Sequence, residues 1–251
     1  SRLVRRHGWD GIVLELGIGA KLQVVQALQG RGELPPRSSG EMPPDPPLGR
    51  SPANFVRLLG DALRKDNADA LLFLVAPAHP WLFSAVDWTA VRPHVDRLVL
   101  MTYDYSHGLP QSEVGPKEHP NAPLSWVRLV VQSLLGGSST GDGKVLLGIN
   151  YYGRRFDANG FGGEPVVGHE YLDFLRLLPP DHQLIWDERW AEHYVVSTGE
   201  GNAPASVYYH PTAESVSARV RLALEMGLAG VSVWEVGQGL DQFDKALYAP
   251  G

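Results

Sequence analysis

Apolar residues recur along the chain in short runs that predict five strands. In the first, GWDGIVLELG at residues 8–17, apolar positions alternate with Val13, Glu15 and Gly17, so these three residues share one face of a strand. Glu15 is the only ionisable residue on that face. Four further apolar runs, of the length and composition of buried parallel strands, lie at residues 70–76, 97–103, 144–150 and 229–234.

Helices are predicted between these strands, where apolar residues recur at helical spacing. Ser51 and Pro52 combine a capping hydroxyl with a proline in the first turn, and Thr212 supplies a capping hydroxyl for a later helix. Further helices are predicted at residues 86–95 and 123–135. Because strands and helices alternate, the sequence predicts an α/β fold built on a parallel sheet.

One segment interrupts this alternation. Residues 154–212 contain a helical stretch at 171–178 and two β-like pieces at 183–186 and 205–209. We therefore predict a single domain over residues 1–251, with a small α+β insertion at 154–212 before the final strand.

Composition narrows the range of partners. The 251 residues are 43% hydrophobic and carry a net charge of −6, so the chain can bury a core but has no sequence-wide basic surface. We expect no nucleic-acid partner. No apolar run is long enough for a transmembrane segment, and the first residues lack the apolar core of a signal peptide. The absence of cysteine excludes disulfides and thiolate metal sites, and we expect no cofactor and no metal.

Polar and aromatic residues stand where the predicted strands end. In parallel barrels the functional groups lie at the carboxyl ends of the strands. A mixture of carboxylates, phenols, an amide and an indole suits a neutral, polyhydroxylated ligand, whose C–H faces stack on rings while its hydroxyls need polar partners. The candidate ligand-binding residues are Glu15, Tyr103, Asp104, Asn150, Tyr151 and Trp234.

Several of these strand ends resemble a known family. MTYDY at 101–105, GINYYG at 148–153 and GVSVWEVGQGLD at 230–241 are similar to the later strands of glycoside hydrolase family 18, the chitinase-like TIM barrels. The resemblance implies a (β/α)8 barrel of the chitinase type. This chain would supply its last five strands, so we expect a barrel truncated on its N-terminal side.

The first strand stands where that family carries its DxxDxDxE signature. Asp10 matches the first Asp, Val13 and Glu15 replace the second and third, and Gly17 stands in the position of the proton-donating Glu. Glycine has no proton to donate. Loss of a general acid lowers the rate by about 10²- to 10⁴-fold, so the resemblance predicts a protein without efficient glycosidase activity.

Three other positions keep the residues of the family. Tyr103 and Asp104 match the Tyr-Asp pair that holds the acetamido group of the sugar, and Trp234 matches the tryptophan beneath the bound ring. The resemblance therefore predicts binding of chito-oligosaccharides, oligomers of N-acetylglucosamine, or related N-acetylhexosamine glycans. One branch of the family, which has further similar segments, implies a secreted or lysosomal location.

Two alternatives remain open at this point. The protein is a weakly active glycosidase if Glu15 or Asp104 has taken over as the acid, because burial can raise the pKa of a carboxyl group. It is a receptor-binding scaffold if the barrel serves to present a surface to a partner protein. In that case the Gly- and Pro-rich loops predicted at 30–52 and 106–122 would carry the function.

Overall fold

The computed structural model describes residues 2–15, 50–80, 82–106, 120–137, 141–157, 162–179, 182–197 and 205–248. The chain falls into two units, each with its own set of contacts. The first unit consists of Ser1–Met101 and Val130–Leu146, and the second consists of Thr102–Leu129 and Leu147–Gly251.

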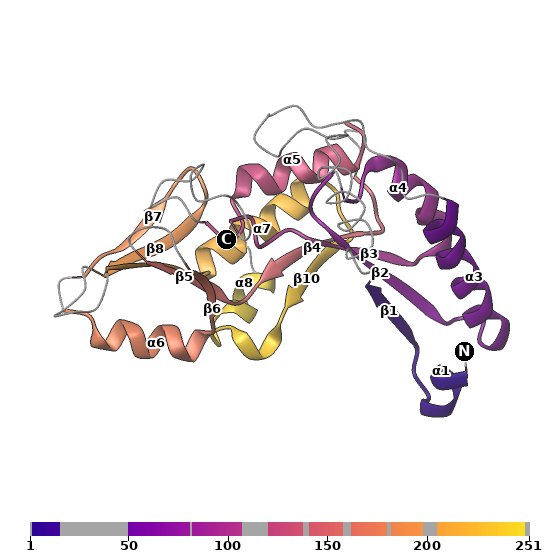
Figure 1. Ribbon diagram of the computed structural model, residues 1–251, viewed down its shortest axis with the longest axis horizontal. Coiled ribbons are helices and arrows are strands. Elements are labelled where there is room, and N and C mark those ends of the chain that lie inside the picture. Colours follow the sequence, from indigo (N-terminus) through magenta and orange to yellow (C-terminus); the bar gives the residue numbers. More distant parts are fainter. Residues whose placement is uncertain are drawn as a thin grey trace, which may run out of the picture. The chain divides into compact units, whose positions relative to one another are not determined.

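The first unit is built on parallel strands. Strand β2 (Leu71–Pro77) lies between β1 (Gly11–Glu15) and β3 (Arg97–Met101), with Gly11 opposite Leu71 and Phe73 opposite Arg97. Strand β4 (Val145–Asn150) begins in this unit and continues into the second. Helix α1 (Arg2–His7) precedes β1, and α3 (Arg50–Asp66), α4 (Ala85–Val91) and the 3-10 helix η1 (Arg92–His94) occupy the connections between the strands (Figure 1).

The core of this unit comes from the apolar positions of α3 and the strands. Burial of such side chains contributes about 25 cal/mol for each Å² of apolar surface, which holds the helix against the sheet. Helix α4 begins with a capping box in which the Ser84 hydroxyl and the Asp87 carboxylate each accept from the backbone of the other residue. The buried residues include Val56, Leu63, Leu72, Leu74, Leu98 and Leu100.

The second unit carries the end of β4 beside β10 (Gly230–Trp234), which completes the strand order β1-β2-β3-β4-β10. Helix α5 (Leu124–Leu134) begins in this unit. Helices α7 (Ala213–Glu225) and α8 (Phe243–Tyr248) follow later, with the 3-10 helix η3 (Val236–Gln238) between β10 and α8. One core cluster joins the end of β4 to α7 and α8 through Ile149, Tyr151, Val216, Val220, Phe243 and Ala246.

The same unit contains a second, antiparallel sheet in the order β6-β5-β9-β8-β7 (Figure 1). Its strands are β5 (Gly153–Asp157), β6 (Gly162–Val166), β7 (Leu184–Asp187), β8 (Glu192–Ser197) and β9 (Ser206–Tyr209). Helix α6 (Gly168–Leu177) packs on this sheet through a core that includes Val166, Tyr171 and Val195.

The main elements agree with the predicted ones. All five predicted parallel strands form, the predicted helices at 86–95 and 123–135 correspond to α4 with η1 and to α5, and Thr212 is the N-cap of α7. In the segment 154–212 the predicted pieces appear as α6, β7 and β9, whereas β5, β6 and β8 were not predicted.

Val13 and Glu15 are both exposed in β1, as residues that share one face. Gly17 lies outside the described residues, as do most of the loops predicted at 30–52 and 106–122. None of the helices within the described ranges is long and apolar enough to cross a membrane.

Candidate functional site

Asp104, just beyond the end of β3, is the centre of a polar cluster in the second unit. Its Oδ1 accepts a hydrogen bond from the Tyr152 hydroxyl and two from Arg154, at 3.0 Å from Nε and 2.5 Å from Nη2. The Arg154 side chain is only 8% exposed, whereas that of Asp104 is 36% exposed. We call Tyr103, Asp104, Tyr152 and Arg154 the Asp104 cluster. Its carboxylate is held firmly on one side and accessible on the other.

The two aromatic members of this cluster contact each other, and one of them also contacts Arg154. Tyr103 lies edge-on to Tyr152, with ring centroids 6.3 Å apart, and the Arg154 guanidinium lies 5.5 Å from the centre of the Tyr152 ring. Burial, followed by the negative charge of Asp104, raises the pKa of Tyr152. The phenol therefore stays protonated and remains a donor to Asp104.

Strand β5 places Arg154 beside Asp104 because its backbone approaches β9 closely. A Cβ atom on Gly153 would lie 2.3 Å from the Tyr209 carbonyl oxygen, so only glycine fits at this position. The next residue, Arg154, pairs with Tyr209 on one side and Pro165 on the other, and its Nη1 donates to the Gly163 carbonyl. The antiparallel sheet thus supplies the cation of the cluster.

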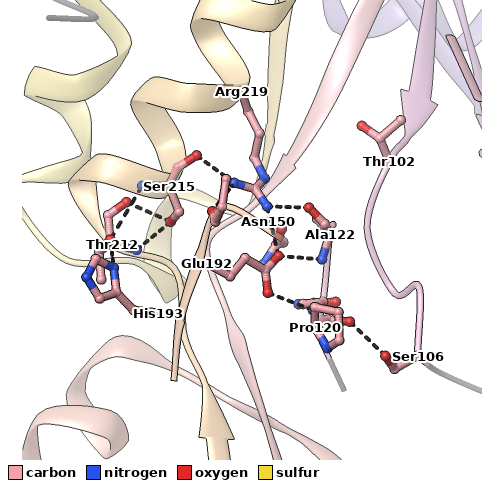
Figure 2. Close-up of polar contacts among 12 residues, drawn as sticks. Thr102, Ser106, Pro120, Ala122, Asn150, Glu192, His193, Thr212, Ser215 and Arg219 are labelled. Carbon is pink, nitrogen blue, oxygen red and sulfur yellow. Dashed lines mark hydrogen bonds and ion pairs between the residues drawn. The ribbon is translucent and has the colours of Figure 1, made fainter. Parts of the chain in front are cut away.

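A buried ion pair lies nearby, between Glu192 of β8 and Arg219 of α7 (Figure 2). Arg219 Nη2 donates to Glu192 Oε1 at 2.8 Å, and the backbone N–H groups of Asn121 and Ala122 donate to the same carboxylate. Burial is the largest influence on both ions; it raises the pKa of Glu192 and lowers the pKa of Arg219, while their mutual attraction opposes both changes.

Asn150 is a buried member of the same region. Its Nδ2 donates to the Tyr152 carbonyl at 2.8 Å, so the amide supports the turn that leads from β4 into β5. A small cavity of about 10 Å³, room for roughly one water molecule, is bordered by Asn121, Asn150, Glu192 and Arg219 among others. It is far too small for a sugar.

Tyr151 and Trp234 meet through their backbones but differ in exposure. The Tyr151 N–H donates to the Trp234 carbonyl at 2.7 Å, and the Tyr151 ring packs edge-on to Phe243 in the core. Burial, with a smaller effect of the Asp244 charge, raises the pKa of Tyr151 to about 12. Trp234 is 53% exposed, and its peptide bond to Glu235 is cis. Trp234 is thus an accessible indole, whereas Tyr151 is a core residue whose ligand-binding role stays a prediction.

Glu15 belongs to the first unit. It is the last residue of β1, lies opposite Val75 in the register of β2, and is exposed. Asp10, the retained signature residue, is exposed as well, and its carbonyl accepts from the Leu71 N–H at 2.9 Å. Within the part of the chain that the structure describes, no three His, Cys, Asp or Glu side chains are placed to hold a metal ion.

Of the predicted residues, Tyr103 and Asp104 therefore lie in one cluster. Its other two members, Tyr152 and Arg154, were not predicted, although Asn150, Tyr152 and Arg154 alternate along the chain and such alternation marks one face of a strand. Asn121, which contacts both Asp104 and Tyr152, was not predicted either.

Solved structures with a similar fold include several chitinases. A chitinase from Chromobacterium violaceum superposes with a TM-score of 0.69 at 19% identity, over 99% of this chain and 68% of its own. The spore cortex-lytic enzyme SleL of Bacillus cereus matches with a TM-score of 0.69 at 18% identity, over 98% of this chain; our chain spans 50% of that enzyme's length.

A third structure is a chitinase from Cycas revoluta in complex with (GlcNAc)3, which has a TM-score of 0.66 at 17% identity, over 97% of this chain and 67% of its own. Identities this low establish the fold alone, which is the chitinase-type TIM-barrel fold. The family model described as glycosyl hydrolases family 18 matches residues 1–239. Because this match covers most of the chain, the protein belongs to glycosyl hydrolases family 18.

Proposed function

We propose that this protein binds chito-oligosaccharides or related N-acetylhexosamine glycans and does not hydrolyse them efficiently. The observation that carries the proposal is the Asp104 cluster, an accessible carboxylate whose Oδ1 is held by Tyr152 and Arg154. A fixed carboxylate with an open side suits the hydroxyl and amide donors of an amino sugar. The similar Cycas revoluta chitinase was solved in complex with (GlcNAc)3, which supports a glycan of this type.

Trp234 supplies the apolar part of the proposed site. The indole is exposed, and it belongs to β10, beside the strand that leads to Tyr152. Aromatic faces pack well against the C–H groups of a sugar ring. We propose that Trp234 stacks on the sugar while the Asp104 cluster receives its acetamido group and hydroxyls.

Asp104 is better suited to orient a ligand than to protonate one. Its Oδ1 accepts three hydrogen bonds, two of them from a guanidinium, so this oxygen is already occupied as an acceptor. Together with glycine at position 17, this arrangement favours binding without efficient cleavage. Glu15, exposed at the end of β1, is the residue on which the alternative of a weakly active hydrolase depends.

We further propose that the protein belongs to the branch of the family represented by chitinase domain-containing protein 1. The supporting segments are NAPLSWVR at 121–128, EPVVG at 164–168 and YHPTAES at 209–215. From this assignment we also propose that the protein is secreted or lysosomal and that a receptor protein is its second partner.

Calorimetric titration with (GlcNAc)3 tests the glycan proposal. We expect binding to the unmodified protein, and a loss of about tenfold or more in affinity for Trp234→Ala, since the stacking surface is removed. Trp9→Ala is the matched control, because Trp9 is also half exposed, at 51%, but lies before β1. Its affinity should be unchanged.

Incubation of the same oligomer, with separation of the products, tests for cleavage. We expect the oligomer to remain intact. Cleavage that disappears in Glu15→Gln would instead identify a weakly active hydrolase that uses Glu15 as its acid. If the unmodified protein does not bind the oligomer at all, the glycan proposal is wrong and the receptor-binding scaffold remains.

A further inference from the structure

We propose that the buried Glu192–Arg219 ion pair positions the Asp104 carboxylate for its ligand, and that Asn121 transmits this effect. The inference rests on the proposed function, in which Asp104 contacts the glycan. Glu192, Arg219 and Asn121 are positioning residues here, because each acts through Asp104.

The ion pair fixes two consecutive backbone groups. Glu192 Oε2 accepts from the Asn121 N–H at 2.9 Å, and Oε1 accepts from the Ala122 N–H at 2.6 Å. Arg219 Nη2 donates to the Ala122 carbonyl. The ion pair therefore binds three backbone groups of this segment, two N–H groups and one carbonyl. Figure 2 shows Glu192 and Arg219 reaching this segment from β8 and α7.

Stability alone is a weak reason for such a pair. The two side chains are only 7% and 4% exposed, and the cost of removing both charges from water offsets much of their mutual attraction. Apolar residues of similar size often stabilise a fold as well as a buried ion pair does. Apolar residues cannot, however, hold the backbone N–H groups of Asn121 and Ala122 in place.

Asn121 connects this anchored segment to Asp104. Its Oδ1 accepts from the Asp104 N–H at 2.9 Å, and its carbonyl accepts from the Tyr105 N–H at 2.9 Å. Its Nδ2 donates to the Tyr152 carbonyl at 3.3 Å. One residue therefore holds the backbone of Asp104, of its neighbour, and of the phenol that donates to the Asp104 carboxylate.

The backbone of Asp104 needs such support. Its φ is +64°, in the left-handed region that residues other than glycine seldom adopt. The hydrogen bond from Asp104 N–H to Asn121 keeps this conformation, which directs the carboxylate toward Tyr152 and Arg154. Without the Asn121 side chain, the backbone is free to relax and the carboxylate to leave its donors.

Asn121→Ala tests the proposal with little damage to the rest of the network. The variant loses the acceptor for the Asp104 N–H but keeps the backbone groups that bind Glu192 and Arg219. We expect amide hydrogen exchange at Asp104 to accelerate by about tenfold or more, since the part-buried hydrogen bond that protects this N–H is lost. Unchanged protection at Asp104 would overturn the proposal. This readout needs no sugar.

Ligand preference gives the second readout. Cellotriose has the β-1,4-linked rings of (GlcNAc)3 but lacks acetamido groups, so a displaced Asp104 should lower the preference for (GlcNAc)3 over cellotriose by about tenfold. A merely structural effect would weaken both ligands equally, and that result would contradict the proposal. If the unmodified protein binds neither sugar, the proposed function fails, and exchange at Asp104 still decides whether Asn121 positions it.

Two further variants complete the test. Thr212→Ala is the stability control, because it removes a capping hydroxyl of α7 but no bond to Asn121, Glu192 or Arg219. It should lower the thermal midpoint without changing exchange at Asp104 or the sugar preference. Glu192→Gln should accelerate exchange at Asp104 as Asn121→Ala does, and a folded Glu192→Gln protein with unchanged exchange would overturn the role of the ion pair. If that variant does not fold, Asn121→Ala decides alone.

Discussion

At the scale of single residues, the most informative contacts are the hydrogen bonds that Asp104 Oδ1 accepts. A phenol and a guanidinium hold this oxygen, so the direction of the whole carboxylate is set before any ligand arrives. A group that is already ordered loses little conformational entropy on binding, which favours affinity. Arg154 is central to this arrangement because its planar group binds Asp104 through two nitrogens.

Arg154→Lys should weaken glycan binding while leaving the fold intact. Lysine keeps the charge but offers a single ammonium in place of two fixed donors, so we expect (GlcNAc)3 affinity to fall about tenfold in calorimetric titration. Arg155→Lys is the matched control. Arg155 is the next residue of β5 and is half exposed, and its partner is Glu164 at 3.9 Å. Equal losses in the two variants would contradict a specific role for Arg154.

His210 should make the fold sensitive to mild acid. Burial lowers the pKa of His210 to about 4, from 6.5 for an ordinary histidine, and its ring is stacked on Tyr171. Between about pH 4 and pH 6.5, His210 is protonated in the unfolded chain but not in the folded chain. Stability therefore falls as the pH is lowered from about 6.5 to about 4, by up to about 1.4 kcal/mol per pH unit.

Urea unfolding at about pH 7.5 and about pH 5 measures this effect. His210→Gln should be less stable at the higher pH but lose less stability on acidification than the unmodified protein. His182→Gln is the control, since His182 also contacts a proline carbonyl but is exposed. An unmodified protein with the same midpoint at both pH values would refute the assignment to His210.

At the scale of elements, hydrophobic patterning predicted the parallel strands and their helices but not β5, β6 and β8. Strands β5 and β8 share a feature that explains this. Each of these two strands contains a buried charge, Arg154 in β5 and Glu192 in β8. Patterning treats a charge as an exposed position, whereas here Asp104 and Arg219 neutralise the two charges inside the fold. The buried charges of the candidate site are thus the reason why hydrophobic patterning did not predict these two strands.

The site itself was predictable only where neighbours along the chain specify it. Tyr103 and Asp104 follow directly from the end of an apolar run, and the alternation of Asn150, Tyr152 and Arg154 was available in the sequence. Asn121 is different, because it lies 17 positions from Asp104 and meets it only through the tertiary fold. No local sequence pattern predicts the contact between Asn121 and Asp104.

Gly153→Ala should disrupt the junction between β5 and β9. The added Cβ would meet backbone atoms, among them the Tyr209 carbonyl oxygen at 2.3 Å, which cannot move aside as a flexible side chain can. We expect a loss of about 1–3 kcal/mol in the free energy of unfolding, measured in urea, together with weaker (GlcNAc)3 binding. Gly143→Ala, where the Cβ meets nothing within 4 Å, should change stability by less than about 0.5 kcal/mol. Similar losses in the two variants would show that the close approach is unimportant.

At the scale of the whole molecule, the net charge of −6 contrasts with the uncharged ligand that we propose. Binding of a polyanion releases counterions and weakens steeply with salt, whereas a neutral oligosaccharide releases few. We expect (GlcNAc)3 affinity to change by less than about twofold between roughly 0.05 and 0.5 M NaCl. A tenfold decline in calorimetric affinity over this range would contradict the expectation, because it would show that charged groups of the protein control the binding of this uncharged sugar.

The way in which Glu192 holds its loop has a consequence for how such a site can diversify. Its carboxylate accepts hydrogen bonds from the backbone N–H groups at positions 121 and 122. Every residue except proline has such an N–H group. The anchor of the loop therefore tolerates substitution at 121, while the contact to Asp104 depends on the side chain at that position. Ligand preference can change there by single substitutions without the loop being rebuilt, so folding and recognition can evolve separately within one short segment.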